Sequence, residues 1–93
     1  VGQALAFKLL GAKFNTPTHK IFDNKVYVLM GDGCVMEGCT SEVSSLAGHL
    51  QLDNLIVIYD ANKVSLDGPL SDSCSEDTKA RYLAYGWEVF EVD

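Results

Sequence analysis

The sequence has little positive charge and few residues that hold metals or form disulfides. Seven Lys and Arg residues stand against 13 Asp and Glu residues, which gives a net charge of −6. No basic stripe is present, so nucleic acid is not an expected partner. Three cysteines, Cys34, Cys39 and Cys74, without C-x-x-C spacing favour reduced thiols in a cytoplasmic protein over a disulfide or zinc site, with an organelle left open. His19 and His49 are too scattered to predict a metal cluster.

Long apolar runs and targeting segments are also missing. No apolar stretch approaches the roughly 20 residues that cross a bilayer, so a membrane is not an expected partner. The first residues, VGQALAFKLLGAKF, lack an initiator Met, a basic region and a cleavage site, so they are not a signal peptide. They resemble the middle of a helix, and the last residues resemble the end of a strand. We therefore interpret residues 1–93 as a partial domain, a fragment of a longer chain.

What is present is an alternation of helical and strand patterns. Helices are expected over 1–14, 36–50 and 75–85, and short apolar runs typical of buried strands cover 25–30, 54–60 and 87–92. Ser75 is the expected N-cap of the last helix and Gly86 its expected end. Small residues in the middle helix indicate a close neighbour, either another helix or another subunit. The alternation predicts an α/β fold, a parallel sheet with helices on both faces, built here from three strands and three helices.

The segment GDGCVMEG at 31–38 places the carboxylate of Asp32 between two glycines at the end of a predicted strand. The dinucleotide-binding pattern G-x-G-x-x-G requires a third glycine where Met36 stands. Asp32 would also repel a pyrophosphate. A nucleotide-binding domain of the Rossmann type is therefore the less favoured alternative.

A divalent cation explains the carboxylate better. Mg²⁺ prefers six oxygen ligands, commonly one or two carboxylates with phosphate oxygens and water. Asp32 could hold the ion, the ion could hold a diphosphate, and the Gly33 N–H could donate to the same anion. Asn62 follows the next predicted strand, and the carboxyl ends of parallel strands share one edge of a sheet. Asp32 and Asn62 are therefore expected to lie close together.

Longer stretches of the sequence around these residues resemble a known protein family. GDGCVMEGCTSEVSSLAGHLQLDNLIVIYDANKVSLDG at 31–68 is similar to the transketolase family, which uses thiamine diphosphate, and ARYLAYGWEV at 80–89 continues the likeness. Many thiamine diphosphate enzymes end this signature with two adjacent Asn residues, whereas this chain has Asp60-Ala61-Asn62. Transketolases commonly vary there.

The resemblance implies a ligand set. The side chains of Asp32 and Asn62 and the backbone carbonyl of Val64 would bind Mg²⁺ or Ca²⁺, and the Gly33 amide would contact the diphosphate. Glu37 and Glu42 match glutamates near the subunit interface that help to link two active sites. For Glu37 a simple interaction with the helix dipole is an equal alternative.

The resemblance also implies an activity for the parent enzyme. It is a transferase of carbohydrate metabolism, in the pentose phosphate pathway, that moves a two-carbon ketol unit from a ketose phosphate to an aldose phosphate as a homodimer. The family's substrate-contacting histidines and its activating glutamate lie outside this stretch, so we expect the 93 residues alone to be inactive. The rival interpretation is a non-catalytic α/β fragment or interaction module without a cofactor.

Overall fold

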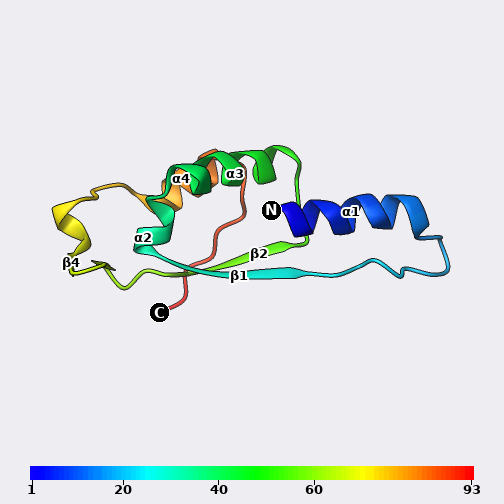
Figure 1. The fold of residues 1–93 in the computed structure, drawn as a ribbon, viewed down its shortest axis with the longest axis horizontal. Coiled ribbons are helices and arrows are strands. Elements are labelled where there is room, and N and C mark those ends of the chain that lie inside the picture. The colour runs from blue at the N-terminus through cyan, green and yellow to red at the C-terminus, as the bar shows by residue number, and fades with distance from the viewer.

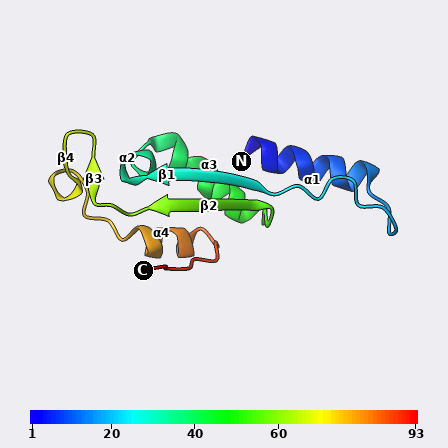
Figure 2. The same ribbon diagram turned by 90° about the horizontal axis from the view of Figure 1, so that it is seen from below.

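Two parallel strands form the centre of the fold. The computed structural model describes all of residues 1–93, and its sheet pairs β1 (Val26–Gly31) with β2 (Leu55–Asp60) so that Gly31 lies opposite Asp60. The crossover that parallel strands require is made by α3 (Gly38–His49). Figures 1 and 2 show the elongated shape that results, 52 Å long and 22 by 21 Å across. The predicted α/β class with a parallel sheet is confirmed.

The other elements are short apart from the first helix. They are α1 (Gly2–Phe14), α2 (Asp32–Val35), β3 (Val64–Ser65), β4 (Gly68–Pro69), the 3₁₀ helix η1 (Leu70–Asp72) and α4 (Thr78–Ala84). No helix combines the length and the apolar character that a membrane crossing needs. β3 and β4 form a small antiparallel hairpin in a segment for which we predicted neither a helix nor a strand.

The helix expected over 36–50 is present as α3, and a short helix that the sequence did not predict, α2, precedes it. α2 forms a single turn directly after β1, and Glu37 then adopts an extended conformation (φ −67°, ψ 130°) as the N-cap of α3. Apolar residues keep a helical spacing from Val35 onward, so the sequence pattern did not reveal the extended residue between α2 and α3.

The last helix begins later than expected. Asp77, and not Ser75, is the N-cap of α4, since its Oδ1 accepts a hydrogen bond from the Ala80 N–H at 2.9 Å. A side-chain oxygen at this position satisfies an N–H group that has no partner within the helix. Gly86 has a φ of +86° directly after the helix, so its predicted role as the end of the helix is confirmed.

Residues 87–92 do not form the expected third strand. Trp87 is fixed, because its Nε1 donates to the Ser44 carbonyl at 2.9 Å, but the segment beyond it pairs with no strand. Glu91 instead forms an ion pair with Lys79 of α4, and Phe90 and Val92 stay exposed. A strand forms only where a neighbour offers free backbone groups, and no strand of this chain pairs with the segment.

The helices cover one face of the sheet. Ala4, Ala47, Leu52 and Leu55 form the buried core, and Figure 1 shows α1, α3 and α4 together on one side of β1 and β2. On the opposite side Tyr27, Leu29, Ile56 and Ile58 alternate with the inward residues and are exposed. We call these four residues the open sheet face. Helices on both faces, as we expected, are not present within these residues.

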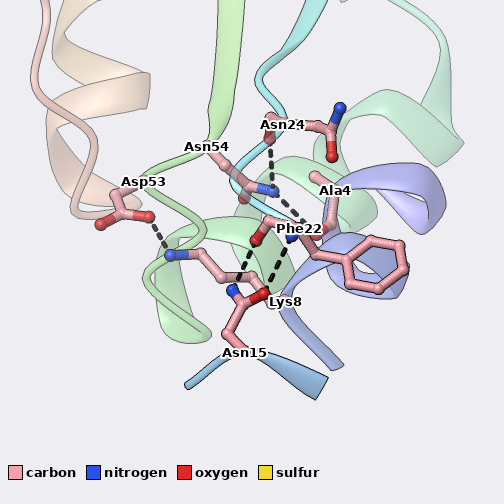
Figure 3. Close-up of polar contacts among 7 residues, drawn as sticks. All are labelled: Ala4, Lys8, Asn15, Phe22, Asn24, Asp53 and Asn54. Atoms are coloured by element: carbon pink, nitrogen blue, oxygen red, sulfur yellow. Dashed lines mark hydrogen bonds and ion pairs between the residues drawn. The ribbon is translucent and has the colours of Figure 1, made fainter. Parts of the chain in front are cut away.

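Polar contacts tie the amino ends of both strands to α1 (Figure 3). The buried Asn54 donates through Nδ2 to the carbonyl of Ala4 at 3.0 Å and to the carbonyl of Asn24 at 3.4 Å. Asn15 and Phe22 exchange two hydrogen bonds of 2.9 Å, which close the loop between α1 and β1. These contacts hold the end of the sheet that lies away from Asp32.

Candidate functional site at the carboxyl ends of the strands

Asp32 is a buried carboxylate without a cationic partner. It is the first residue of α2, directly after β1, and is only 3% exposed. The three ion pairs of the chain involve other acids. Because an isolated buried charge is costly, Asp32 requires hydrogen bonds, a cation or both.

Two hydrogen-bond donors, one in β2 and one in the loop that follows it, reach this carboxylate. The Tyr59 hydroxyl donates to Asp32 Oδ1, and the backbone N–H of Lys63 donates to Oδ2 at 2.7 Å. Tyr59 belongs to β2, and Lys63 follows that strand by three residues. The expectation that the ends of the two strands approach each other is therefore met at Asp32.

The loop after β2 holds Asn62 in a defined orientation. Asn62 Nδ2 donates to Asp60 Oδ2 at 3.1 Å, and Asn62 Oδ1 accepts from the Val64 N–H at 3.0 Å. The second bond is an Asx turn, in which a side-chain oxygen binds the backbone two residues on. Oδ1 keeps a second lone pair for another ligand. Lys63 between them has a φ of +63°, a left-handed conformation that a non-glycine residue adopts only where its surroundings enforce it.

The carbonyl of Val64 points away from the β3–β4 hairpin. Val64 pairs with Pro69. The neighbouring pair, Lys63 and Leu70, is joined by a hydrogen bond of 2.8 Å from the Leu70 N–H to the Lys63 carbonyl. Antiparallel pairs alternate between bonded and non-bonded, so the Val64–Pro69 pair is non-bonded. Pro69, which has no N–H, fits this position, and the Val64 carbonyl is left free of β4.

Gly33 follows Asp32 in the first turn of α2, where N–H groups have no partner within the helix. A Cβ atom at position 33 would lie 3.6 Å from Ser65 Oγ, an ordinary contact. The first turn of α2 thus faces β3, the strand that carries Val64.

The oxygens that the resemblance names as metal ligands are of the kind that a hard divalent cation prefers. They would be the side-chain oxygens of Asp32 and Asn62 and the main-chain oxygen of Val64, and only Asp32 is a carboxylate. The chain contains no group of three or more His, Cys, Asp or Glu side chains that could hold a metal ion. Mg²⁺ typically takes one or two carboxylates and completes its shell with phosphate and water.

Comparison with known proteins decides the family. The family model described as "Transketolase, thiamine diphosphate binding domain" matches residues 1–93. The chain belongs to the transketolase family. Transketolase of Physarum polycephalum is 59% identical over 92 residues, which are 99% of this chain and 14% of that protein. Transketolase 1 of Saccharomyces cerevisiae is 55% identical over 93 residues, all of this chain and 14% of that protein.

Solved transketolase structures agree with the fold. Transketolase from Leishmania mexicana superposes with a TM-score of 0.95 at 50% identity, over 98% of this chain and 14% of that one. A Pichia stipitis transketolase in complex with sedoheptulose-7-phosphate has a TM-score of 0.93 at 53% identity, over 96% of this chain and 13% of that one. This transketolase segment therefore spans about one seventh of the length of its relatives. The Rossmann-type and non-catalytic alternatives are not favoured.

Tyr59 is the residue of this transketolase segment that sequence reasoning missed. Burial, and then the hydrogen bond to the Asp32 carboxylate, raise the pKa of its phenol above the usual value, so the phenol stays a neutral donor. The sequence shows it only as part of the apolar run at 54–60, and no role was predicted for it. Strand alternation could have placed its side chain on one face, but not beside Asp32.

Glu37 and Glu42 lie apart from the Asp32 site. Both side chains are exposed, and neither takes part in an ion pair or side-chain hydrogen bond of this chain. Glu37 is the N-cap residue of α3 but makes no capping hydrogen bond with its side chain. Their expected place near a subunit interface stays a prediction.

Proposed function

We propose that residues 1–93 are the metal- and diphosphate-anchoring part of a longer transketolase. The observation that carries this proposal is Asp32: a buried carboxylate without a cationic side chain, bonded to the loop that presents Asn62 and Val64. In this proposal Asp32, Asn62 and the Val64 carbonyl hold Mg²⁺ or Ca²⁺. The Gly33 N–H donates to the diphosphate.

Each residue has a separate task in anchoring the cofactor. Asp32 supplies the negative charge, while Asn62 and Val64 supply neutral oxygens that add no repulsion towards a diphosphate. Bound thiamine diphosphate supplies the electron sink for cleavage and formation of a bond next to a carbonyl carbon. The chain's own contribution is to bind and orient the diphosphate end of that cofactor.

We further propose sugar phosphates as substrates, with transfer of a two-carbon ketol unit from a ketose phosphate to an aldose phosphate. Structures of Pichia stipitis transketolase in complex with sedoheptulose-7-phosphate and with xylulose-5-phosphate support this class of substrate. The full-length enzyme is proposed to be a homodimer, with Glu37 and Glu42 near the subunit interface. The isolated 93-residue chain is proposed to be inactive in ketol transfer.

The test uses the full-length protein and the Asp32→Asn variant, with Asp67→Asn as the matched control. Asp67 lies exposed in the same loop region and makes no ion pair. We expect thiamine diphosphate to raise the Tm of the wild type and of Asp67→Asn only when Mg²⁺ is present. Asp32→Asn should lose that shift together with ketol transfer.

Three results would contradict the proposal. A cofactor shift that is independent of Mg²⁺, or retained in Asp32→Asn, would remove Asp32 as the metal ligand. Stabilisation by NAD in place of thiamine diphosphate would favour a nucleotide-binding domain. Ketol transfer by the purified 93-residue chain would show that the segment is not merely an anchor.

A further inference from the structure

Tyr59 reaches Asp32 from the neighbouring strand. It lies opposite Met30 in the parallel register, and its half-buried side chain extends past the end of β1 to donate to Asp32 Oδ1. Asp32 also accepts from the Lys63 N–H, at Oδ2. Each oxygen of the carboxylate therefore has one protein donor.

The two donors differ in how firmly they are held. Lys63 belongs to the loop after β2 and is itself in a left-handed conformation. Tyr59 sits within the paired part of β2, where the backbone is fixed by β1. A carboxylate rotates easily about its last torsion, because that torsion has broad minima. Without Tyr59, the carboxylate plane would follow the loop.

The remaining lone pairs of Asp32 are sufficient for a cation. An ionised carboxylate offers about four lone-pair sites on its two oxygens, and two of them are used here. The hydrogen bond from Tyr59 therefore does not occupy the whole of Oδ1. It fixes the direction in which the free lone pairs point.

We propose that Tyr59 is a positioning residue for the metal site, a role that rests on the proposed function of Asp32 as a metal ligand. The Tyr59 hydroxyl holds the Asp32 carboxylate in its binding orientation before the cation arrives. Hydrogen-bond partners of metal ligands typically contribute 10–100-fold to affinity. Loss of the hydroxyl should therefore weaken divalent metal binding by about 10-fold or more.

The experiment compares the full-length protein with its Tyr59→Phe and Tyr27→Phe variants. Tyr27 is the matched control, because it lies on the adjacent strand, is 66% exposed on the open sheet face and makes no side-chain hydrogen bond. Free Mn²⁺ is measured by electron paramagnetic resonance during titration of each protein in saturating thiamine diphosphate. Tyr59→Phe should raise the Kd for Mn²⁺, and Tyr27→Phe should match the wild type.

A spectroscopic readout separates positioning from a merely structural role. Binding of the cation to Asp32 withdraws charge from the acceptor of the Tyr59 hydrogen bond, so Mn²⁺ should perturb the tyrosine absorption difference spectrum. That signal should persist in Tyr27→Phe and vanish in Tyr59→Phe. If Tyr59→Phe does not fold, the pair 4-methylphenylalanine and 4-aminophenylalanine at position 59 keeps the ring and its volume. The amino form restores a donor and should recover Mn²⁺ affinity.

The outcomes distinguish this inference from the proposed function. If Asp32→Asn abolishes Mn²⁺ binding while Tyr59→Phe binds as the wild type, Tyr59 has no positioning role and the metal site stands. If Asp32→Asn binds Mn²⁺ normally, the proposed metal site itself is wrong. A lower Tm for Tyr59→Phe with unchanged Mn²⁺ affinity would also overturn the inference, since only stability would depend on the hydroxyl.

Discussion

Gly48 of α3 lies directly against the main-chain carbonyl of Tyr85, the residue that ends α4. A Cβ atom built on Gly48 would lie 1.9 Å from the Tyr85 carbonyl oxygen and 2.9 Å from its carbon. The two helices therefore approach each other backbone to backbone at this point. The small residues of α3 admit another helix, one of the two neighbours that the sequence allowed.

Gly48→Ala should destabilise this contact strongly, because backbone atoms of Tyr85 cannot move aside as a flexible side chain could. Overpacking of this kind costs roughly 1–3 kcal/mol, and sometimes more. Gly38→Ala, in the same helix, is the control, since nothing lies within 4 Å of a Cβ at position 38. Thermal unfolding of the full-length protein, together with hydrogen exchange of α3 and α4, measures the stability of both variants. Equal stability of the two variants would contradict the contact.

Asn54→Asp should destabilise the amino ends of the strands. Asn54 Nδ2 donates to the carbonyls of Ala4 and Asn24, whereas a carboxylate at neutral pH can only accept. A buried carbonyl that faces a carboxylate loses its donor and gains repulsion, so we expect a cost of roughly 2 kcal/mol or more. Asn24→Asp is the control, because that side chain is exposed and makes no hydrogen bond. Unfolding by urea compares the stability of the two variants. An Asn54→Asp variant as stable as the wild type would be inconsistent with the hydrogen bonds of Asn54.

The hydrogen bond between Ser44 and Tyr82 should be detectable as a coupling between α3 and α4. Their oxygens lie 3.1 Å apart, and both residues are buried. Tyr82→Phe should cost about 1 kcal/mol, and the double variant with Ser44→Ala should cost less than the sum of the single variants. Tyr85→Phe, one turn further along, removes a hydroxyl without a hydrogen-bond partner and should be nearly neutral. Strict additivity would show that the bond contributes nothing.

Lys79 should titrate at a higher pH than an ordinary lysine. Its Nζ donates to Glu91 Oε2 at 2.6 Å, and this bond and the charge of Glu91 raise the pKa of the ammonium group. The folded state thus favours the charged form, so the stabilisation is present below the usual lysine pKa and is lost as the pH rises through the higher value. Carbon-13 methylated lysines, observed by NMR, report the midpoint, with Lys79→Arg for assignment. Glu91→Gln should restore the ordinary midpoint, and Glu88→Gln should not.

The sequence predicted the meeting of Asp32 with the loop after β2 for a topological reason. Two apolar runs separated by a helical stripe predict parallel neighbours, and parallel strands end at the same edge. The resemblance then assigned roles to Asp32, Asn62 and Val64. The free carbonyl of Val64 depends on the alternation within a hairpin, which no pattern in the sequence indicated.

The features that the sequence did not predict depend on which segments meet in the folded chain. The run at 87–92 has strand composition, but whether it pairs depends on a neighbour that composition does not describe. The choice of Asp77 over Ser75 as N-cap depends on where the chain turns into α4, since both residue types are good caps. The contact of Tyr59 with Asp32 was not predicted, because the two residues lie 27 positions apart in the chain.

The flush ending of β1 and β2, with Gly31 opposite Asp60, limits which changes in chain length the family can accept. One residue deleted within either strand would shift one end past the other by about 3.3 Å and turn every later side chain to the opposite face. Asp32 would then lose Tyr59 and Lys63 together. The exposed loop at 16–21, closed by the hydrogen bonds between Asn15 and Phe22, lies outside the two strands whose ends must stay level. Insertions and deletions among transketolases should therefore collect in that loop and spare the two strands.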